Sequence, residues 1–112
     1  MVVLHEMFPD CPYVLPASWE PLEGAYVKKP LYGREGANVA FMKGKEVIHK
    51  TEGPYNGPYI YQETKELPCF DGNYPVIGSW LINGWAAGIG IREDKTPITS
   101  NTSRFVPHIF SK

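Results

Sequence analysis

The 112-residue chain has few cysteines, almost no net charge and no long apolar run. Its two cysteines, Cys11 and Cys69, lack the close spacing of a zinc ribbon or a thiol redox motif, so we expect free thiols. The 11 basic and 12 acidic side chains give a net charge of −1. Such a balance argues against binding to nucleic acid or to an anionic membrane surface through charge alone.

Long hydrophobic segments are also missing from the sequence. No segment approaches the roughly 20 apolar residues of a transmembrane helix, and the first residues lack the basic start and apolar run of a signal peptide. These absences predict a soluble protein of the reducing cytoplasm, with neither a nucleic-acid nor a membrane partner.

Glycine and proline, by contrast, are abundant at 11 residues each, which excludes a helical bundle and predicts turns and hairpins. A short helix is predicted over residues 2–8, before an irregular connector that reaches residue 24. Strands are predicted over residues 25–29, 39–42, 46–49, 59–67, 74–82 and 85–92, followed by a polar, turn-rich tail over 93–112. The predicted class is α+β, a mostly antiparallel sheet with short helices.

A glycine-containing loop follows the first predicted strand. The strand brings Lys29 to a loop in which Gly33 and Gly36 allow tight turning. Successive main-chain N–H groups of such a loop can bind phosphate oxygens, and Lys29 and Arg34 add positive charge. A plain turn beside a solvated lysine is the competing interpretation, since the order of residues is not that of a P-loop.

The hairpin over residues 78–94 is a second candidate. Alternation along its second strand places Ala86, Gly88, Gly90 and Arg92 on one nearly bare face, which a ligand could approach while Arg92 binds a phosphate or carboxylate. The alternative is that this face packs under a helix and that Arg92 pairs with Glu93 or a remote acid.

The strand that begins with Tyr59–Gln62 and continues into polar residues 63–65 is a third candidate, either a hinge beside a purine base or an ordinary edge strand. Metal binding has little support. The three histidines are far apart in the sequence, and the acids Asp71, Glu93 and Asp94 form no convincing magnesium cluster.

Taken together, the motifs resemble the C-terminal part of the glutathionylspermidine synthase family, which is similar to ATP-grasp enzymes. The resemblance covers residues 1–110. The motifs are Lys-Pro-Leu-Tyr-Gly-Arg-Glu-Gly-Ala-Asn at 29–38, Ile-Tyr-Gln at 60–62 with Leu-Pro at 67–68, Gly-Ser-Trp at 78–80, Ala-Gly-Ile-Gly-Ile-Arg-Glu-Asp at 87–94 and Ser-Arg-Phe-Val-Pro-His at 103–108. The resemblance implies an acid–amine ligase that activates a carboxylate with ATP and joins it to an amine.

The resemblance also implies roles for individual residues. Lys29 corresponds to a lysine that contacts the ATP phosphates, and Glu35 and Gly36 lie in the loop that folds over the nucleotide. Gln62, Glu63, Thr64 and Lys65 correspond to the hinge that lines the adenine, with a weaker correspondence at Pro97–Thr99. Arg92 corresponds to a catalytic arginine near the transferred phosphate.

One departure from the family pattern changes the expected activity. The family's Mg²⁺ ligands lie upstream of the matched region, so we expect this chain to be inactive alone. We expect one segment, with a connector over residues 1–24 and, over residues 25–112, the nucleotide-binding part of an ATP-grasp-like lobe. It would be a truncated ligase or one subunit of a split ligase, with a missing N-terminal segment or self-association as its completion. The alternative is a non-enzymatic, β-rich interaction domain. The acid and amine substrates are not identified by the sequence.

Overall fold

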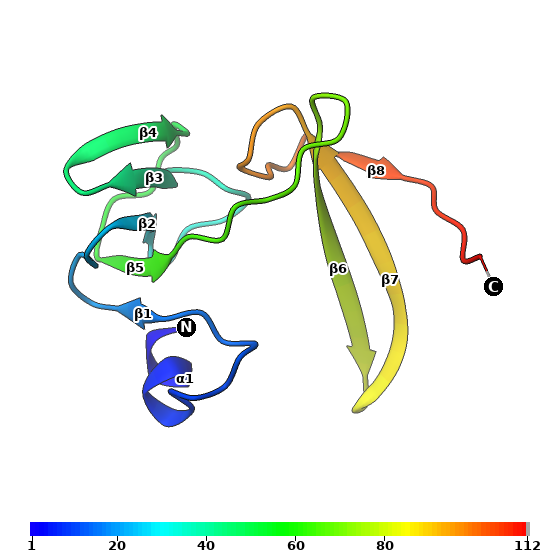
Figure 1. Ribbon diagram of the computed structural model, residues 1–112, viewed down its shortest axis with the longest axis horizontal. Helices are drawn as coiled ribbons and strands as arrows, with labels where there is room; N and C mark the ends of the chain where they lie inside the picture. The colour runs from blue at the N-terminus through cyan, green and yellow to red at the C-terminus, as the bar shows by residue number, and fades with distance from the viewer. Residues whose placement is uncertain (112) are drawn as a thin grey trace. The chain divides into compact units, whose positions relative to one another are not determined.

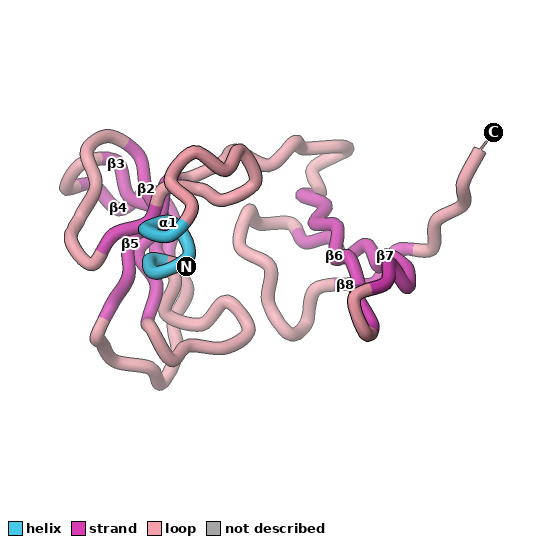
Figure 2. Tube along the Cα trace, turned by 90° about the horizontal axis from the view of Figure 1, so that it is seen from below, coloured by secondary structure: helices cyan, strands magenta, loops and turns pink. Residues whose placement is uncertain are grey.

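The computed structural model describes residues 1–111, which form two compact units divided between Lys65 and Glu66. The N-terminal unit contains α1 (Val2–Met7), β1 (Ala17–Ser18), β2 (Ala25–Pro30), β3 (Ala40–Lys43), β4 (Glu46–Lys50) and β5 (Tyr59–Glu63) (Figure 1). The C-terminal unit contains β6 (Tyr74–Ile82), β7 (Trp85–Asp94) and β8 (Arg104–Val106). Figure 2 shows how little of the described chain is helical.

The N-terminal unit is an antiparallel sheet of five strands in the order β1-β5-β2-β3-β4. A tight turn at Gly44, whose φ is +58°, joins β3 to β4 and permits their pairing. The apolar side of α1 supplies Val2, which packs with Ala17 of β1 and Ile60 of β5 in the small core of this unit. The core is therefore built at the β1–β5 side of the sheet.

The two faces of the central pair β2 and β5 differ in chemistry. Directly opposed residues share a face in an antiparallel pair, so Lys29, paired with Ile60, lies on the face that carries the core. Gln62 is paired with Val27 and lies on that same face. Lys28 lies on the other face, where its Nζ is 4.1 Å from the centroid of the Tyr59 ring. Adjacent lysines of one strand thus have different surroundings.

The C-terminal unit is a long β6–β7 hairpin with β8 added to β7. Asn83 and Gly84 both have positive φ, as the predicted two-residue turn requires. The apolar side chains near this turn are exposed, and the most exposed are Trp80, Leu81 and Trp85, at 66%, 70% and 77%. The hairpin therefore forms without burying most of its own apolar surface.

The mostly antiparallel sheet predicted from the sequence is confirmed, whereas α1 is the one helix of the described residues. Two short strands, β1 and β8, were not predicted, and β5 ends at Glu63 rather than at residue 67. Both missed strands are held by pairing to a distant strand, which local sequence does not encode. No helix within residues 1–111 is long and apolar enough to cross a membrane.

The predicted face alternation of β7 is wrong near the turn. Trp80 pairs with Gly88 but the next residue, Leu81, pairs with Ala86, so the strand carries a β-bulge. The bulge moves Ala86 to the face opposite Gly88, and only Gly88, Gly90 and Arg92 keep the predicted common face. A one-residue bulge inverts the side on which all later side chains lie.

Candidate functional site

A pocket of about 150 Å³ lies in the N-terminal unit at the end of β2. Its lining consists of Lys29, Pro30, Val39 and residues 33–37. Five residues that the sequence singled out for phosphate binding, namely Lys29, Gly33, Arg34, Glu35 and Gly36, are therefore in one pocket. The residues that connect β2 to β3 fold back over the end of β2, where Pro30 closes the strand.

Lys29 is the half-buried charge of this pocket. Its Nζ donates a hydrogen bond of 2.6 Å to Oε1 of Gln62 on the neighbouring strand β5. Because part of the side chain is withdrawn from water, burial lowers the pKa of the Lys29 ammonium below its ordinary value. An ammonium that has lost part of its hydration gains more from an anion than an exposed one does.

The 33–38 loop turns sharply at its centre. Ala37 N–H donates to Arg34 O at 2.9 Å, and the two residues between them, Glu35 and Gly36, have φ of 56° and 70°. This left-handed pair is easy for glycine and uncommon for glutamate. The turn leaves the main-chain N–H groups of Arg34, Glu35 and Gly36 without a hydrogen-bond partner among the described residues. Successive donors of this kind suit an anion.

Gln62 is the first of the four candidate hinge residues, and its side chain accepts the hydrogen bond of the pocket lysine. Glu63 ends β5 and its N–H donates to Pro16 O at 2.8 Å, while Thr64 is half-buried and Lys65 is exposed. The boundary between the two units follows Lys65 directly. The four residues thus lead from the pocket to the connection between the units.

Arg92 belongs to the C-terminal unit, where β8 and the 95–103 loop surround it. Its guanidinium lies over the Phe105 ring, with Cζ 5.5 Å from the ring centroid, and Nη2 donates to Ser100 O. A Cβ at Gly90 would be 3.9 Å from Phe105, so an aromatic ring covers this part of the face that the sequence predicted to be bare. Arg92 does not pair with Glu93, which binds Arg104 instead at 2.7 Å.

The Nε of Arg92 is buried and has no hydrogen-bond partner among residues 1–111. A buried, unpaired donor is costly, and a donor on a cation is more so. An acceptor such as a phosphate or carboxylate oxygen would remove this cost. A role for Arg92 in binding a phosphate or carboxylate stays a prediction.

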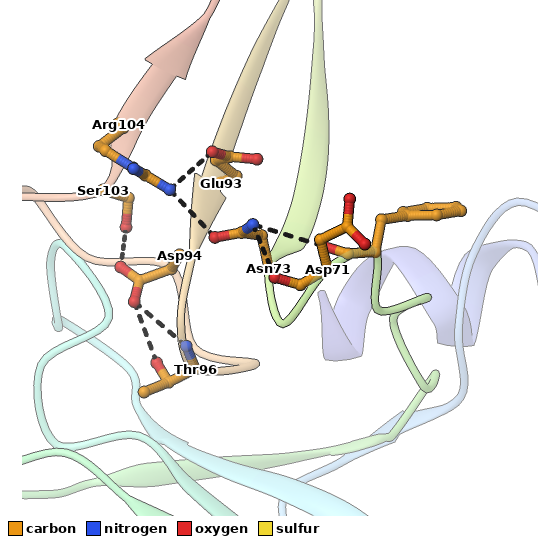
Figure 3. A network of polar contacts seen from close by, with 8 residues as sticks. Asp71, Asn73, Glu93, Asp94, Thr96, Ser103 and Arg104 are labelled. Atoms are coloured by element: carbon orange, nitrogen blue, oxygen red, sulfur yellow. Dashed lines mark hydrogen bonds and ion pairs between the residues drawn. The ribbon is translucent and has the colours of Figure 1, made fainter.

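A polar network around Asp94 and Ser103 holds the 95–103 loop (Figure 3). Buried Ser103 donates from Oγ to Oδ2 of Asp94 at 2.5 Å and accepts from Ser100 N–H at 2.8 Å. The hydrogen bond from Ser103 holds the pKa of the Asp94 carboxyl below its ordinary value, and bonds from Thr96 act in the same direction. Ser100 O, which Arg92 contacts, is therefore on a fixed loop.

Within residues 1–111 no group of three histidine, cysteine, aspartate or glutamate side chains is arranged to hold a metal ion. The same part of the chain contains Cys11 and Cys69 as free cysteines.

The sequence of the described residues matches a known protein family. The family described as glutathionylspermidine synthase preATP-grasp matches residues 1–111. The chain belongs to this family. The resemblance inferred from the sequence motifs is thus confirmed, and the glutathionylspermidine synthase family covers both units and the pocket at Lys29.

Individual relatives agree with this assignment. A Haemophilus influenzae protein with the provisional name acid–amine ligase is 45% identical over 119 residues, covering 96% of the chain. Trypanothione synthetase of Crithidia fasciculata is 37% identical over 109 residues, covering 92% of it. The bifunctional glutathionylspermidine synthetase/amidase of Escherichia coli is 29% identical over 116 residues, covering 98%. The chain spans only 30%, 17% and 19% of the lengths of these three proteins.

Several residues that contact or end the 33–38 loop were not singled out as site residues by sequence reasoning. Thr51 and Gly53 approach the 33–38 loop from the segment after β4, and Asn38 ends that loop with a side-chain bond to the same segment. The left-handed φ of Asn38, 55°, is a conformation that asparagine tolerates, so Asn38 carried a local signal. Thr51 and Gly53 carried none, because their partners lie 12 or more residues away.

Proposed function

We propose that this chain is the ATP-binding segment of an ATP-dependent carboxylate–amine ligase, and that the pocket at Lys29 binds phosphate oxygens of the nucleotide. The observation that carries the proposal is that Lys29 lines one pocket together with residues 34–36, whose main-chain N–H groups have no hydrogen-bond partner among the described residues. Membership of the family and the names of its synthetase relatives support the same reaction class.

The chemistry of phosphoryl transfer fits this arrangement. Such reactions depend mainly on positioning and on stabilising developing negative charge, not on covalent steps by the protein. In a ligase of this class, ATP phosphorylates the carboxylate and ADP is released; an amine then attacks the acyl phosphate and displaces phosphate, which forms the amide. Lys29 and the N–H groups of the 33–38 loop would bind and orient phosphate oxygens, and Arg92 would bind the transferred group.

The size of the pocket limits what it can hold. Sites for whole small-molecule ligands occupy about 300–1,000 Å³, and the pocket has about 150 Å³. We infer that it takes phosphate and that the rest of the nucleotide lies outside it. Gln62 reaches Lys29 and leads into Glu63, Thr64 and Lys65. We propose that these four residues line the adenine.

The complete ligase reaction is proposed to require more than this chain. The relatives are several times longer than the region that they share with it. The Mg²⁺ ligands and the acid and amine sites are expected in their other parts, and turnover is not expected from the chain alone. Cytoplasmic location would keep Cys11 and Cys69 reduced.

Calorimetric titration of the chain with ATP, with and without Mg²⁺, tests the proposal. We expect saturable binding of ATP and weaker binding of adenosine, which lacks the phosphates. The Arg92→Lys variant keeps a charge but loses the planar fork, so it should bind ATP more weakly than the wild type. Absence of ATP binding by the wild type at concentrations on the order of 1 mM, equivalent to about −4 kcal/mol, would overturn the proposal.

A non-enzymatic interaction domain, or one subunit of a split ligase, is the second candidate. The β6–β7 hairpin favours it, because Ile77, Trp80, Leu81, Ile82 and Trp85 are each at least 64% exposed. Exposed apolar side chains gathered on one hairpin are a common feature of protein interfaces. Light scattering during size exclusion distinguishes the candidates: self-association that Trp85→Ser abolishes, together with no ATP binding, would favour the interaction domain.

A further inference from the structure

The segment between β4 and β5 contacts the 33–38 loop through hydrogen bonds and close packing. Thr51 Oγ1 donates to Gly36 O at 2.5 Å, and it accepts from Val39 N–H at 3.1 Å. Thr51 N–H also donates to Val39 O at 2.9 Å, which continues the direction of the β3–β4 ladder. One threonine therefore fixes both the turn at Gly36 and the residue that leaves the loop.

Two further contacts attach the same segment to the loop. Asn38 Oδ1 accepts a hydrogen bond of 2.8 Å from Tyr55 N–H. At Gly53 the two backbones are so close that a Cβ would lie 2.6 Å from both Ala37 Cβ and Asn38 Oδ1. Real Cβ atoms do not approach other atoms so closely, so residue 53 has no room for a side chain while this contact persists.

From these contacts we propose that residues 51–55, which we call the strap, position the 33–38 loop for nucleotide phosphates. The inference rests on the proposed function of the pocket. Thr51, Gly53 and Asn38 are positioning residues: their contacts are with the loop, and the N–H groups of residues 34–36 are the proposed phosphate donors.

The Gly36 peptide group is the part of the loop to which the strap bonds most directly. Its carbonyl oxygen would repel an anion if it turned toward the pocket, and the Thr51 hydroxyl holds this oxygen on the strap instead. Ala37 N–H, on the same peptide plane, is held by Arg34 O. With both ends of that plane fixed, the preceding N–H groups keep one orientation without rearranging when a phosphate binds.

The test compares two probes, inorganic tripolyphosphate and adenosine, on matched variants of the full chain. Thr51→Val removes the hydroxyl at nearly constant shape, whereas Thr51→Ser keeps it. A hydrogen bond contributes about 1 kcal/mol, so we expect Thr51→Val to bind tripolyphosphate and ATP roughly fivefold more weakly. Adenosine affinity should be unchanged, and Thr51→Ser should restore the wild-type values.

A second pair of variants acts at the other end of the strap. Asn38→Gly removes the acceptor for Tyr55 N–H but tolerates the positive φ, and Asn38→Asp retains an acceptor oxygen. We expect the first to weaken tripolyphosphate binding selectively and the second to weaken it less. This pair keeps the inference testable if Thr51→Val does not fold.

The outcomes separate the inference from the proposed function. If the wild type binds ATP and tripolyphosphate but Thr51→Val and Asn38→Gly bind both as tightly as it does, the strap has no positioning role. Equal weakening of adenosine and tripolyphosphate would also overturn the inference, since it would indicate general loss of structure. Failure of the wild type to bind any phosphate compound would instead refute the proposed function.

Discussion

Replacing Lys29 by methionine should weaken ATP binding while leaving the fold nearly unchanged. The Lys29 Nζ has one hydrogen bond in the described chain, 2.6 Å to Gln62, and burial lowers the pKa of its ammonium. Methionine keeps most of the apolar stem and removes a partly desolvated charge. The variant therefore loses the cation at the pocket but also the cost of burying it.

The two effects differ in size. A hydrogen bond between a charged donor and a phosphate contributes about 1.5–3 kcal/mol, which corresponds to roughly 10- to 150-fold in ATP affinity. For folding, the lost bond to Gln62 also has a charged donor and costs about 1.5–3 kcal/mol, but relief of desolvation offsets most of this cost. The melting temperature should thus move by no more than about 8 °C.

Lys28→Met is the matched control, because Lys28 is the neighbouring residue of β2 and lies on the opposite face, over Tyr59. Calorimetry gives the ATP affinity of both variants, and circular dichroism gives their melting temperatures. Equal ATP affinities for Lys29→Met and Lys28→Met would refute the assignment of Lys29 to the phosphate site. Unfolding of Lys29→Met alone would refute the energetic reasoning.

Three further predictions concern pH and stability. ATP affinity should fall with rising pH below the ordinary lysine value of 10.5, because Lys29 loses its proton early, and the free energy of unfolding of the ligand-free chain should rise over the same window; titrations of the wild type and of Lys29→Met check both trends. Glu35→Asn should stabilise the chain by about 1 kcal/mol in denaturant unfolding, since asparagine tolerates the left-handed φ at residue 35 better than glutamate. Ser103→Ala should raise the pKa of Asp94 in a carboxyl NMR titration. The stability that Asp94 provides above its unfolded pKa, and loses as pH falls through its folded pKa, should then diminish.

The sequence predicted those parts of the fold whose cause is local. The Asn83–Gly84 turn and the two strands beside it needed only turn chemistry and apolar, strand-forming residues. The same holds for the helix at Val2–Met7 and for the loop after Lys29. Each of these features depends on residues adjacent in the chain, which is the range over which propensity and spacing carry information.

The remaining features depend on contacts between distant segments. β1 exists because Ala17 pairs with Gln62, and the pocket has its shape because Thr51 bonds to Gly36. The environment of Arg92 likewise needed Phe105 and Ser100, which β8 and its preceding loop bring to β7. Residue type and spacing named the charged side chains of the site, but not the neutral residues that hold them.

That division has a physical basis in what a phosphate site must contain. Charge and main-chain donors attract the ligand, and only a few residue types provide them, so they stand out in a sequence. Orientation comes from ordinary threonine, asparagine and glycine residues whose contribution depends on geometry. In this chain, Lys29 and Arg34 would supply the attraction, and the close approach of Gly53 to Ala37 would keep the loop in its place. A change that preserves every charge of the pocket could therefore still weaken phosphate binding.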